Sequence, residues 1–538
     1  MTVAIVFLPA LGAALGLAFL LFPRLRPYQW LPDLGFSALT TLLAGVMLFG
    51  IGWDERLLGA WLPTSTLGEL VVLRPDAPGA AVVFALAIAQ FASALTRRSA
   101  SWPRLLAACA FGALSMTAFA YSGMALLIGL GLTDAFTAAR RFARGEDAHR
   151  VALDAALWTC ALLIIVMAAA SLADATQYFP LVQFTRRHSG FFAVAVVLRH
   201  AVLVARQTRP NGVDADLTRA DTDLWASHGA GLGGMILLMR LTQLGAAPLP
   251  AWTFAVMLFA ALVTLLRAVF DGHFARASRR ALSGILALGT LSAAAWQAVP
   301  LAATVIGFVL GTGLLRRRMS ELLAHATYRR LVPVALGLGA ATLLGLPLTA
   351  GFLGRAGALT ALFDGASGPG PVVTAMAVTL AFAALTAFAT RAWEEGLSQR
   401  PEVRLDATLA LAGVLLLALT ALALGVAPGL MDGDLTAAVS SLSTVGWACL
   451  GIGIAAGALL WRFRDRLRAR LPASTGAVGD AISNVLSFRW ALDPLAAAAG
   501  RLSQPLGELF VVLESEGALL WTLALALFVL LTSRSPGP

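Results

Sequence analysis

Several ionisable residues lie inside apolar stretches of the chain, where burying a charge is expensive and therefore indicates a function. Histidine titrates near neutral pH without a strong perturbation, so His200 and His228 are the best candidates for proton carriers. The alternative is that each histidine only hydrogen-bonds to a neighbouring carbonyl. The candidates for a proton path are Asp134, Arg199, His200, His228 and Arg355.

The basic residues of the chain are all arginine. None of the 39 basic residues is a lysine. Arginine keeps its proton at every biological pH, whereas a buried lysine can release one, so no lysine-based proton relay can operate here. A codon bias explains the same composition without any function. Arg240 and Arg267 lie near the ends of apolar stretches, where we expect their side chains to reach the membrane surface.

The composition is that of a membrane protein. Of the 538 residues, 59% are hydrophobic and 13% are charged, against about 45–50% and about 25% in soluble domains. This excludes a soluble enzyme, a disordered chain and a fibrous repeat. We find no pattern for a metal, haem or nucleotide, so we expect no cofactor of its own. The net charge of +10 is spread over short loops, which favours membrane topology over nucleic-acid binding.

The apolar segments predict an all-α polytopic membrane protein with about 14–16 transmembrane helices. Sixteen segments follow one another, at about residues 3–22, 33–52, 79–96, 103–120, 122–140, 151–171, 190–207, 225–244, 250–268, 281–297, 299–316, 331–363, 371–392, 407–425, 443–461 and 517–533. The segment 331–363 is too long for one span and contains Gly345, Pro347, Gly351 and Gly354. We therefore expect a broken helix there.

The loops alternate in charge. Connections after odd-numbered segments hold 28 arginines, and those after even-numbered segments hold four. The positive-inside rule places the arginine-rich loops in the cytoplasm. The sequence thus predicts a multi-pass protein of the cytoplasmic membrane with both termini outside.

The stretch 463–516 separates the last two segments. It begins with arginines and then mixes apolar and charged residues, interrupted by Pro494 and Pro505. We expect amphipathic helices at the cytoplasmic interface, with a solvent-exposed linker as the alternative. Residues 517–538 are expected to form the final transmembrane helix and a tail.

One motif resembles a known family. The run "GLPLTAGFLGR", which ends at Arg355, is similar to the twelfth helix of the antiporter-like membrane subunits of respiratory complex I. Relatives of those subunits occur in Mrp-type cation/proton antiporters and in group 4 membrane-bound hydrogenases. Three further stretches fit the same order: "AWLPTSTLGELVVLRPDAPGAAVVF", "WASHGAGLGGMILLMRL" and "VTLLRAVFDGHFARASRRALSGILALGTLS".

The resemblance implies two inverted five-helix repeats, each with a broken helix, and a line of buried charges that relays protons. The family's broken-helix lysines fall at Arg199 and Arg355. Its fifth-helix glutamate falls near Leu132, where Asp134 is the only nearby acid, so Arg199 is expected to lack the usual partner. The implied divisions are N-terminal helices 1–102, first repeat 103–244, second repeat 245–392 and C-terminal helices 393–462.

Three functions remain open. The first is a proton-translocating, or formerly proton-translocating, membrane subunit of a complex I-like or hydrogenase-like oxidoreductase. The second is a structural subunit of such a complex that no longer pumps. The third is a membrane subunit of an Mrp-type antiporter or of an inorganic-carbon uptake system. All three imply a lipid bilayer and other membrane subunits as partners.

Overall fold

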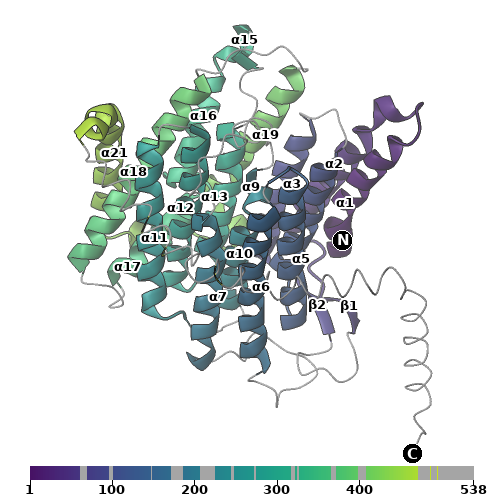
Figure 1. Ribbon diagram of the computed structural model, residues 1–538, viewed down its shortest axis with the longest axis horizontal. Helices are drawn as coiled ribbons and strands as arrows, with labels where there is room; N and C mark the ends of the chain where they lie inside the picture. Colours follow the sequence, from purple (N-terminus) through teal and green to yellow (C-terminus); the bar gives the residue numbers. More distant parts are fainter. Residues whose placement is uncertain are drawn as a thin grey trace, which may run out of the picture. The chain divides into compact units, whose positions relative to one another are not determined.

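Long apolar runs form helices throughout the chain because a backbone in lipid must satisfy its own hydrogen bonds. The computed structural model describes residues 1–60, 70–95, 101–146, 148–170, 186–205, 224–243, 248–271, 274–316, 322–323, 326–364, 371–397, 407–470, 481, 485 and 494. The chain divides into two units, Met1–Ser487 and Phe488–Pro538. Everything below concerns the first unit, whose helices lie side by side (Figure 1).

The helices before the proposed second repeat are the following: α1 Thr2–Phe19, α2 Leu31–Leu48, α3 Ala77–Leu95, α4 Trp102–Ala118, α5 Gly123–Phe142, α6 Ala148–Ala170, α7 Arg186–Ala205, α9 Leu224–Ser227 and α10 Gly229–Gln243. The later helices are α11 Ala251–Phe270, α12 Phe274–Gly289, α13 Ala298–Arg316, α15 Ala326–Arg329, α16 Val332–Leu344, α17 Phe352–Asp364, α18 Pro371–Leu397, α19 Ala407–Val426, α20 Leu435–Ser441 and α21 Thr444–Arg470. A short antiparallel hairpin, β1 Arg56–Ala60 and β2 Leu70–Leu73, precedes α3.

Each of the first fifteen predicted apolar segments coincides with a helix or with a pair of helices. Among the described residues, nine helices are long and apolar enough to cross a membrane, and α16 and α17 are shorter apolar helices. The all-α polytopic membrane fold is therefore confirmed. The last predicted span lies outside the described residues, and so do the interfacial residues 471–480, 482–484, 486–493 and 495–516. The first arginines of that interfacial stretch belong instead to α21, which continues to Arg470.

The predicted break in segment 331–363 is present between α16 and α17. α16 ends at Leu344, and the backbone then turns through Gly345 (φ +69°) and Leu348 (φ +68°). A side chain at position 345 would meet the carbonyl oxygen of Gly351 at 2.9 Å and the side chain of Arg355, so glycine is required. The freed Ala350 amide donates to the carbonyl of Ala421 on α19 at 3.0 Å. The break therefore places Arg355 one turn inside a new helix.

The expected break at Arg199 is not observed. α7 is continuous from Arg186 to Ala205 and carries Arg199 in its interior. Among the described residues of the first half, a helix is interrupted at His228, a single turn residue between α9 and α10. No proline or glycine follows Arg199 within α7, so nothing in its sequence opens the hydrogen-bond ladder there.

Polar contacts join helix ends that the arginine pattern places on the same side of the membrane. At the start of α4, Arg104 donates to the Asp33 carboxylate at 2.7 Å and to the Gln90 carbonyl at 3.1 Å, which links the start of α2 to the end of α3. The indole of Trp461 donates to Glu394 at 2.8 Å and links the ends of α18 and α21. These pairings support the alternation of spans. The side that is cytoplasmic remains a prediction from the arginine excess.

We predict that cysteines placed at Ala148 and Ala324 will react with an impermeant thiol reagent only after the inner face is exposed. A cysteine at Ala437, which follows an even-numbered span, should react in intact cells. The background must lack Cys109, Cys160 and Cys449, because Cys160 is exposed on α6 rather than buried as its apolar surroundings indicate. Labelling of positions 148 and 324 from outside would reverse the predicted orientation.

Candidate functional site

The centre of the first half of the chain is a buried ion pair between α5 and α7. Both guanidinium Nη atoms of Arg199 donate to the carboxylate of Asp134, at 2.9 and 2.5 Å. Arg199 is fully buried and Asp134 is 6% exposed. The Nε of Arg199 donates to the carbonyl of Ala230 on α10 at 3.1 Å. One arginine therefore joins three helices, and Asp134 supplies the partner that the sequence was expected to lack.

Glycines on α10 make room for this pair. A side chain at Gly233 would lie 3.1 Å from Nη2 of Arg199. A side chain at Gly234 would lie within 3.6 Å of both Arg199 and the His200 ring. The side chain of Arg199 on α7 fills the space beside these glycines, so the Asp134–Arg199 pair lies at the interface of α7 and α10.

His200 is buried beside the pair with one nitrogen unused. Its Nδ1 lies 3.0 Å from the carbonyl of Val196, one turn earlier on α7. A carbonyl only accepts, so Nδ1 carries the hydrogen, and Nε2 presents a lone pair. Nε2 is buried and has no hydrogen-bond partner in the described part of the chain. Such an orphaned acceptor is costly for structure alone, and it is available to take up a proton.

His228 lies at the boundary between the two halves of the chain. Its ring is buried and meets the ring of Phe308 on α13 edge-on, with centroids 5.8 Å apart. The neighbouring Ser227 hydroxyl accepts from Nη1 of Arg140 at 2.9 Å and from Nη1 of Arg144 at 3.3 Å. From the sequence these arginines belong only to a basic loop. Arg140 and Arg144 are one helical turn apart in the sequence, and this spacing indicates that both side chains can reach the same residue.

Arg355 is buried, and no acidic residue in the described part of the chain pairs with it. Its side chain is 4% exposed, its Nη2 donates to the carbonyl of Leu343 at 3.3 Å, and its guanidinium lies 5.9 Å from the ring centre of Phe382. Nη1 has no hydrogen-bond partner among the described residues. No carboxylate of the described residues lies within 4 Å of it. Arg355 is therefore a fixed positive charge with weak local compensation.

The guanidinium of Arg355 faces a small cavity. Its volume is about 10 Å³, which is close to what one water molecule needs. The hydroxyls of Thr304 and Thr342 line it, and both already donate to carbonyls of their own helices. They therefore offer acceptors to the cavity, which suits a water bridging them to Nη1. Phe308, which touches His228, lines the same cavity.

Arginine also neutralises the other buried carboxylates near helix ends. Arg240, expected at the membrane surface, is buried and donates to Asp76, to Gln243 at 2.6 Å and to the Ala120 carbonyl at 2.8 Å. The expectation that Arg240 reaches the surface is wrong, because acceptors inside the protein satisfy it. Further pairs of this kind are Arg104 with Asp33, Arg141 with Asp154 and Arg280 with Asp271.

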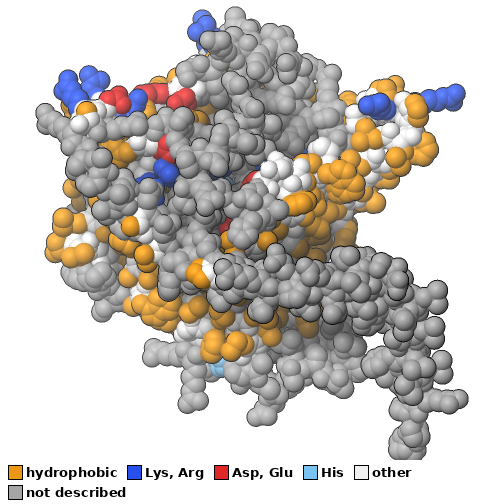
Figure 2. Space-filling view, in the orientation of Figure 1, with side chains coloured by type: hydrophobic (Ala, Val, Ile, Leu, Met, Phe, Trp, Pro, Cys, Tyr) orange, Lys and Arg blue, Asp and Glu red, His pale blue; other side chains and the backbone are white. Residues whose placement is uncertain are grey.

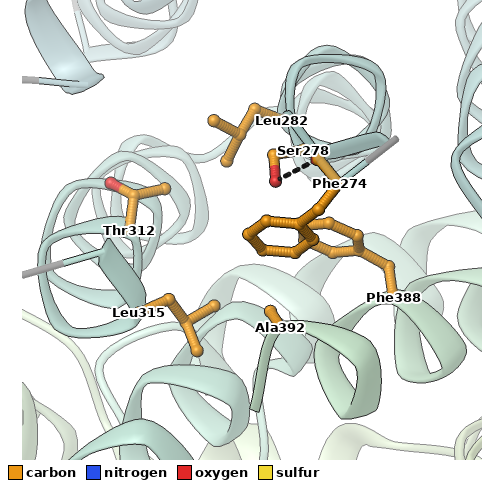
Figure 3. Close-up of a pocket in the computed structure, with 7 residues that line it drawn as sticks. All are labelled: Phe274, Ser278, Leu282, Thr312, Leu315, Phe388 and Ala392. Atoms are coloured by element: carbon orange, nitrogen blue, oxygen red, sulfur yellow. Dashed lines mark hydrogen bonds between the residues drawn. The ribbon is translucent and has the colours of Figure 1, made fainter. Parts of the chain in front are cut away.

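A second pocket does not belong to this site. It lies between α12, α13 and α18 and is lined mainly by apolar side chains, with the rings of Phe274 and Phe388 close together (Figure 3). The hydroxyl of Ser278 donates to the Phe274 carbonyl at 2.9 Å, and that of Thr312 donates to the Phe308 carbonyl at 2.7 Å. Both hydroxyls are thus committed to their own helices, so the pocket offers little to a polar ligand.

The fold described above is shared with chains of solved membrane complexes, whereas sequence comparisons identify no family. No protein-family model matches the chain, and no curated protein matches it either.

Solved structures share this fold. A chain in the Mrp complex from Dietzia sp. DQ12-45-1b is 18% identical with a TM-score of 0.64, covering 100% of this chain and 64% of that one. A chain of respiratory complex I from Thermus thermophilus with bound NADH is 19% identical with a TM-score of 0.59, covering 84% and 99%. A chain of the membrane-bound sulfane sulfur reductase, an archaeal respiratory membrane complex, is 15% identical with a TM-score of 0.56, covering 98% and 99%.

Each similar chain is part of a multi-subunit membrane complex. At these identities the likeness establishes the fold. This chain spans less than two thirds of the length of the similar Mrp chain.

Proposed function

We propose that the chain is an antiporter-like subunit of a multi-subunit complex in the cytoplasmic membrane. We further propose that it moves protons through the cluster of Asp134, Arg199 and His200. The observation that carries this proposal is the bidentate Asp134–Arg199 pair, buried between α5 and α7. An ion pair inside a membrane protein is expensive to bury, and it marks a proton or ion path more often than a structural need.

The residues of the cluster have different roles. A proton that reaches Asp134 neutralises its carboxylate and removes the charge that holds Arg199. Arg199 cannot release a proton, so it acts only as a counter-charge that remains bound to the Ala230 carbonyl. His200 lies against the same glycine of α10 as Arg199 and offers Nε2 as an acceptor. The cluster thus offers two groups that can hold a proton, a carboxylate and an imidazole, beside a fixed cation.

The second half of the chain has a different role. Arg355 is a permanent charge with no acid beside it in the described residues, so it repels a proton and cannot carry one. We propose that it blocks proton passage along α17. Protons that leave the first half would then pass by His228, at the contact with Phe308.

His200→Ala and His228→Ala should each lower proton flux at least tenfold while leaving assembly unchanged. Among the described residues, the His200 ring bonds to a carbonyl of its own helix and belongs to no ion pair, and the His228 ring packs against Phe308. Flux is measured with a pH-sensitive dye in liposomes that contain the assembled complex. His188→Ala, near the start of α7, is the matched control and should keep wild-type flux. Unchanged flux in both test variants would refute the histidine route.

A second candidate function is a structural subunit that does not pump. The observation that favours it is the binding of arginine to the carboxylates of Asp33, Asp76, Asp134, Asp154 and Asp271, of which only that of Asp76 is half-exposed. Carboxylates held in this way resist protonation. A wild-type complex with no flux above protein-free liposomes would favour this candidate.

The type of complex remains a choice between an oxidoreductase, an Mrp-type antiporter and an inorganic-carbon uptake system. Similar folds in an Mrp complex, in complex I and in a sulfane sulfur reductase support membership of such an assembly. We propose the oxidoreductase, in which redox chemistry belongs to partner subunits. Purification of the tagged chain in mild detergent should recover partners that carry iron–sulfur or flavin cofactors. Recovery of membrane subunits alone would favour the antiporter or uptake system.

A further inference from the structure

The end of α21 carries a group of exposed arginines. The apolar part of this helix ends at Leu460, and the helix continues to Arg470. Arginine occupies every second position from 462 to 470. Arg462 and Arg466 are exposed, and so are the apolar side chains of Phe463 and Leu467, each of which directly follows one of them. Blue arginine side chains gather beside the orange surface at this end of α21 (Figure 2).

One arginine of the group is already fixed. The guanidinium carbon of Arg464 lies 3.3 Å from the ring centre of Trp461. Arg464 also lies 3.9 Å from the Glu394 carboxylate and 3.5 Å from that of Asp465. Trp461 in turn donates to Glu394 at 2.8 Å. These contacts join the end of α21 to the end of α18, so the part of α21 that carries the neighbouring arginines is held in place.

Arg462 and Arg466 lack such compensation. Neither has a carboxylate within 4.0 Å among the described residues. They are one helical turn apart, where like charges repel. Arg466 lies 5.7 Å from the ring centre of Phe463, which is 41% exposed. By contrast, Arg104, Arg141 and Arg240 near other helix ends each pair with an acid. The end of α21 therefore presents an unpaired double positive charge beside exposed apolar side chains.

We propose that Arg462 and Arg466 bind the phosphate group of an anionic phospholipid. Guanidinium groups match phosphate oxygens with two parallel hydrogen bonds. Clusters of arginine directly beyond the cytoplasmic end of a transmembrane helix attract anionic headgroups. The exposed Phe463 and Leu467 favour a lipid over an acidic protein surface, because they can lie against acyl chains at the membrane boundary. This binding site is independent of any proton path.

The test compares two pairs of substitutions in the full-length chain. Arg462→Gln/Arg466→Gln removes the proposed site. Arg329→Gln/Arg330→Gln removes two exposed arginines on the same predicted side, which are adjacent in sequence and therefore point in different directions. Each protein is extracted from membranes that contain phosphatidylglycerol and phosphatidylcholine, and the retained lipids are quantified by mass spectrometry.

We expect the first pair to lower retained phosphatidylglycerol at least fivefold, with phosphatidylcholine unchanged, and the control pair to lower it less than twofold. Equal loss from both pairs would show general charge attraction and overturn the proposed site. Unchanged lipid together with loss of a co-purifying subunit would also overturn it, because an acidic protein surface would then be the occupant.

Discussion

Asp134→Asn should destabilise the protein by about 3–5 kcal/mol, the usual result when one partner of a buried ion pair is removed. The amide cannot neutralise Arg199, which would keep its charge and be left with neutral acceptors, the Ala230 carbonyl and the amide oxygen. Proton flux should be lost as well, because the amide does not exchange a proton. Stability is measured as the temperature of half-maximal unfolding in detergent, and flux is measured in liposomes.

A double variant separates folding from transport. Asp134→Leu/Arg199→Leu removes both charges, and such apolar replacements of buried pairs are often neutral or stabilising. We expect its free energy of unfolding to lie within about 1 kcal/mol of the wild-type value. We also expect it to have no proton flux. Wild-type stability of Asp134→Asn would show that the pair contributes little to the fold, contrary to its burial and its short distances.

Arg355→Met should raise the passive proton leak of the complex about tenfold or more. A unit charge within about 8 Å of a passing proton, at an effective dielectric constant of about 20, contributes a barrier of about 2 kcal/mol or more. Methionine keeps the apolar bulk of the side chain but removes this charge. The leak is measured as the decay of an imposed pH gradient in liposomes. Arg391→Met is a control at the end of α18, where Arg391 donates to the Asp271 carbonyl at 2.6 Å.

Arg355→Met should leave the free energy of unfolding of the protein unchanged or raise it. The motif alone favours a loss of a few kcal/mol, on the assumption that Arg355 compensates freed carbonyls or an acid. Within the described part of the chain, Arg355 has one long hydrogen bond to Leu343 and no acid beside it, so the cost of burying the charge is largely uncompensated. A large drop in unfolding temperature, with no change in leak, would mean that Arg355 supports the fold and does not block protons.

Apolar patterning predicts most of the helices because hydrophobic length is a property of the sequence. The glycines and Pro347 likewise predict the break before Arg355, since they weaken the helical ladder locally. The pairing of Asp134 is harder to predict. Positions 132 and 134 are about 200° apart around a helix. Leu132 is 40% exposed and Asp134 is buried, so a shift of two residues decides whether α5 presents an acid to α7.

Contacts between segments that are distant in the sequence are also not predicted by the sequence alone. Arg240 resembles a residue at a span end, yet Asp76 and the Ala120 carbonyl reach it from parts of the chain more than a hundred residues away. Phe308 is one of many apolar residues in its span. Only the packing of α13 against α10 brings it to His228.

Proton flux through liposomes that contain the assembled complex tests the central proposal most directly. The wild type should acidify the liposome interior under an imposed gradient, and Asp134→Leu/Arg199→Leu, folded and assembled to the same extent, should not exceed protein-free liposomes. Wild-type flux in the double variant would contradict a proton path through the Asp134–Arg199 cluster.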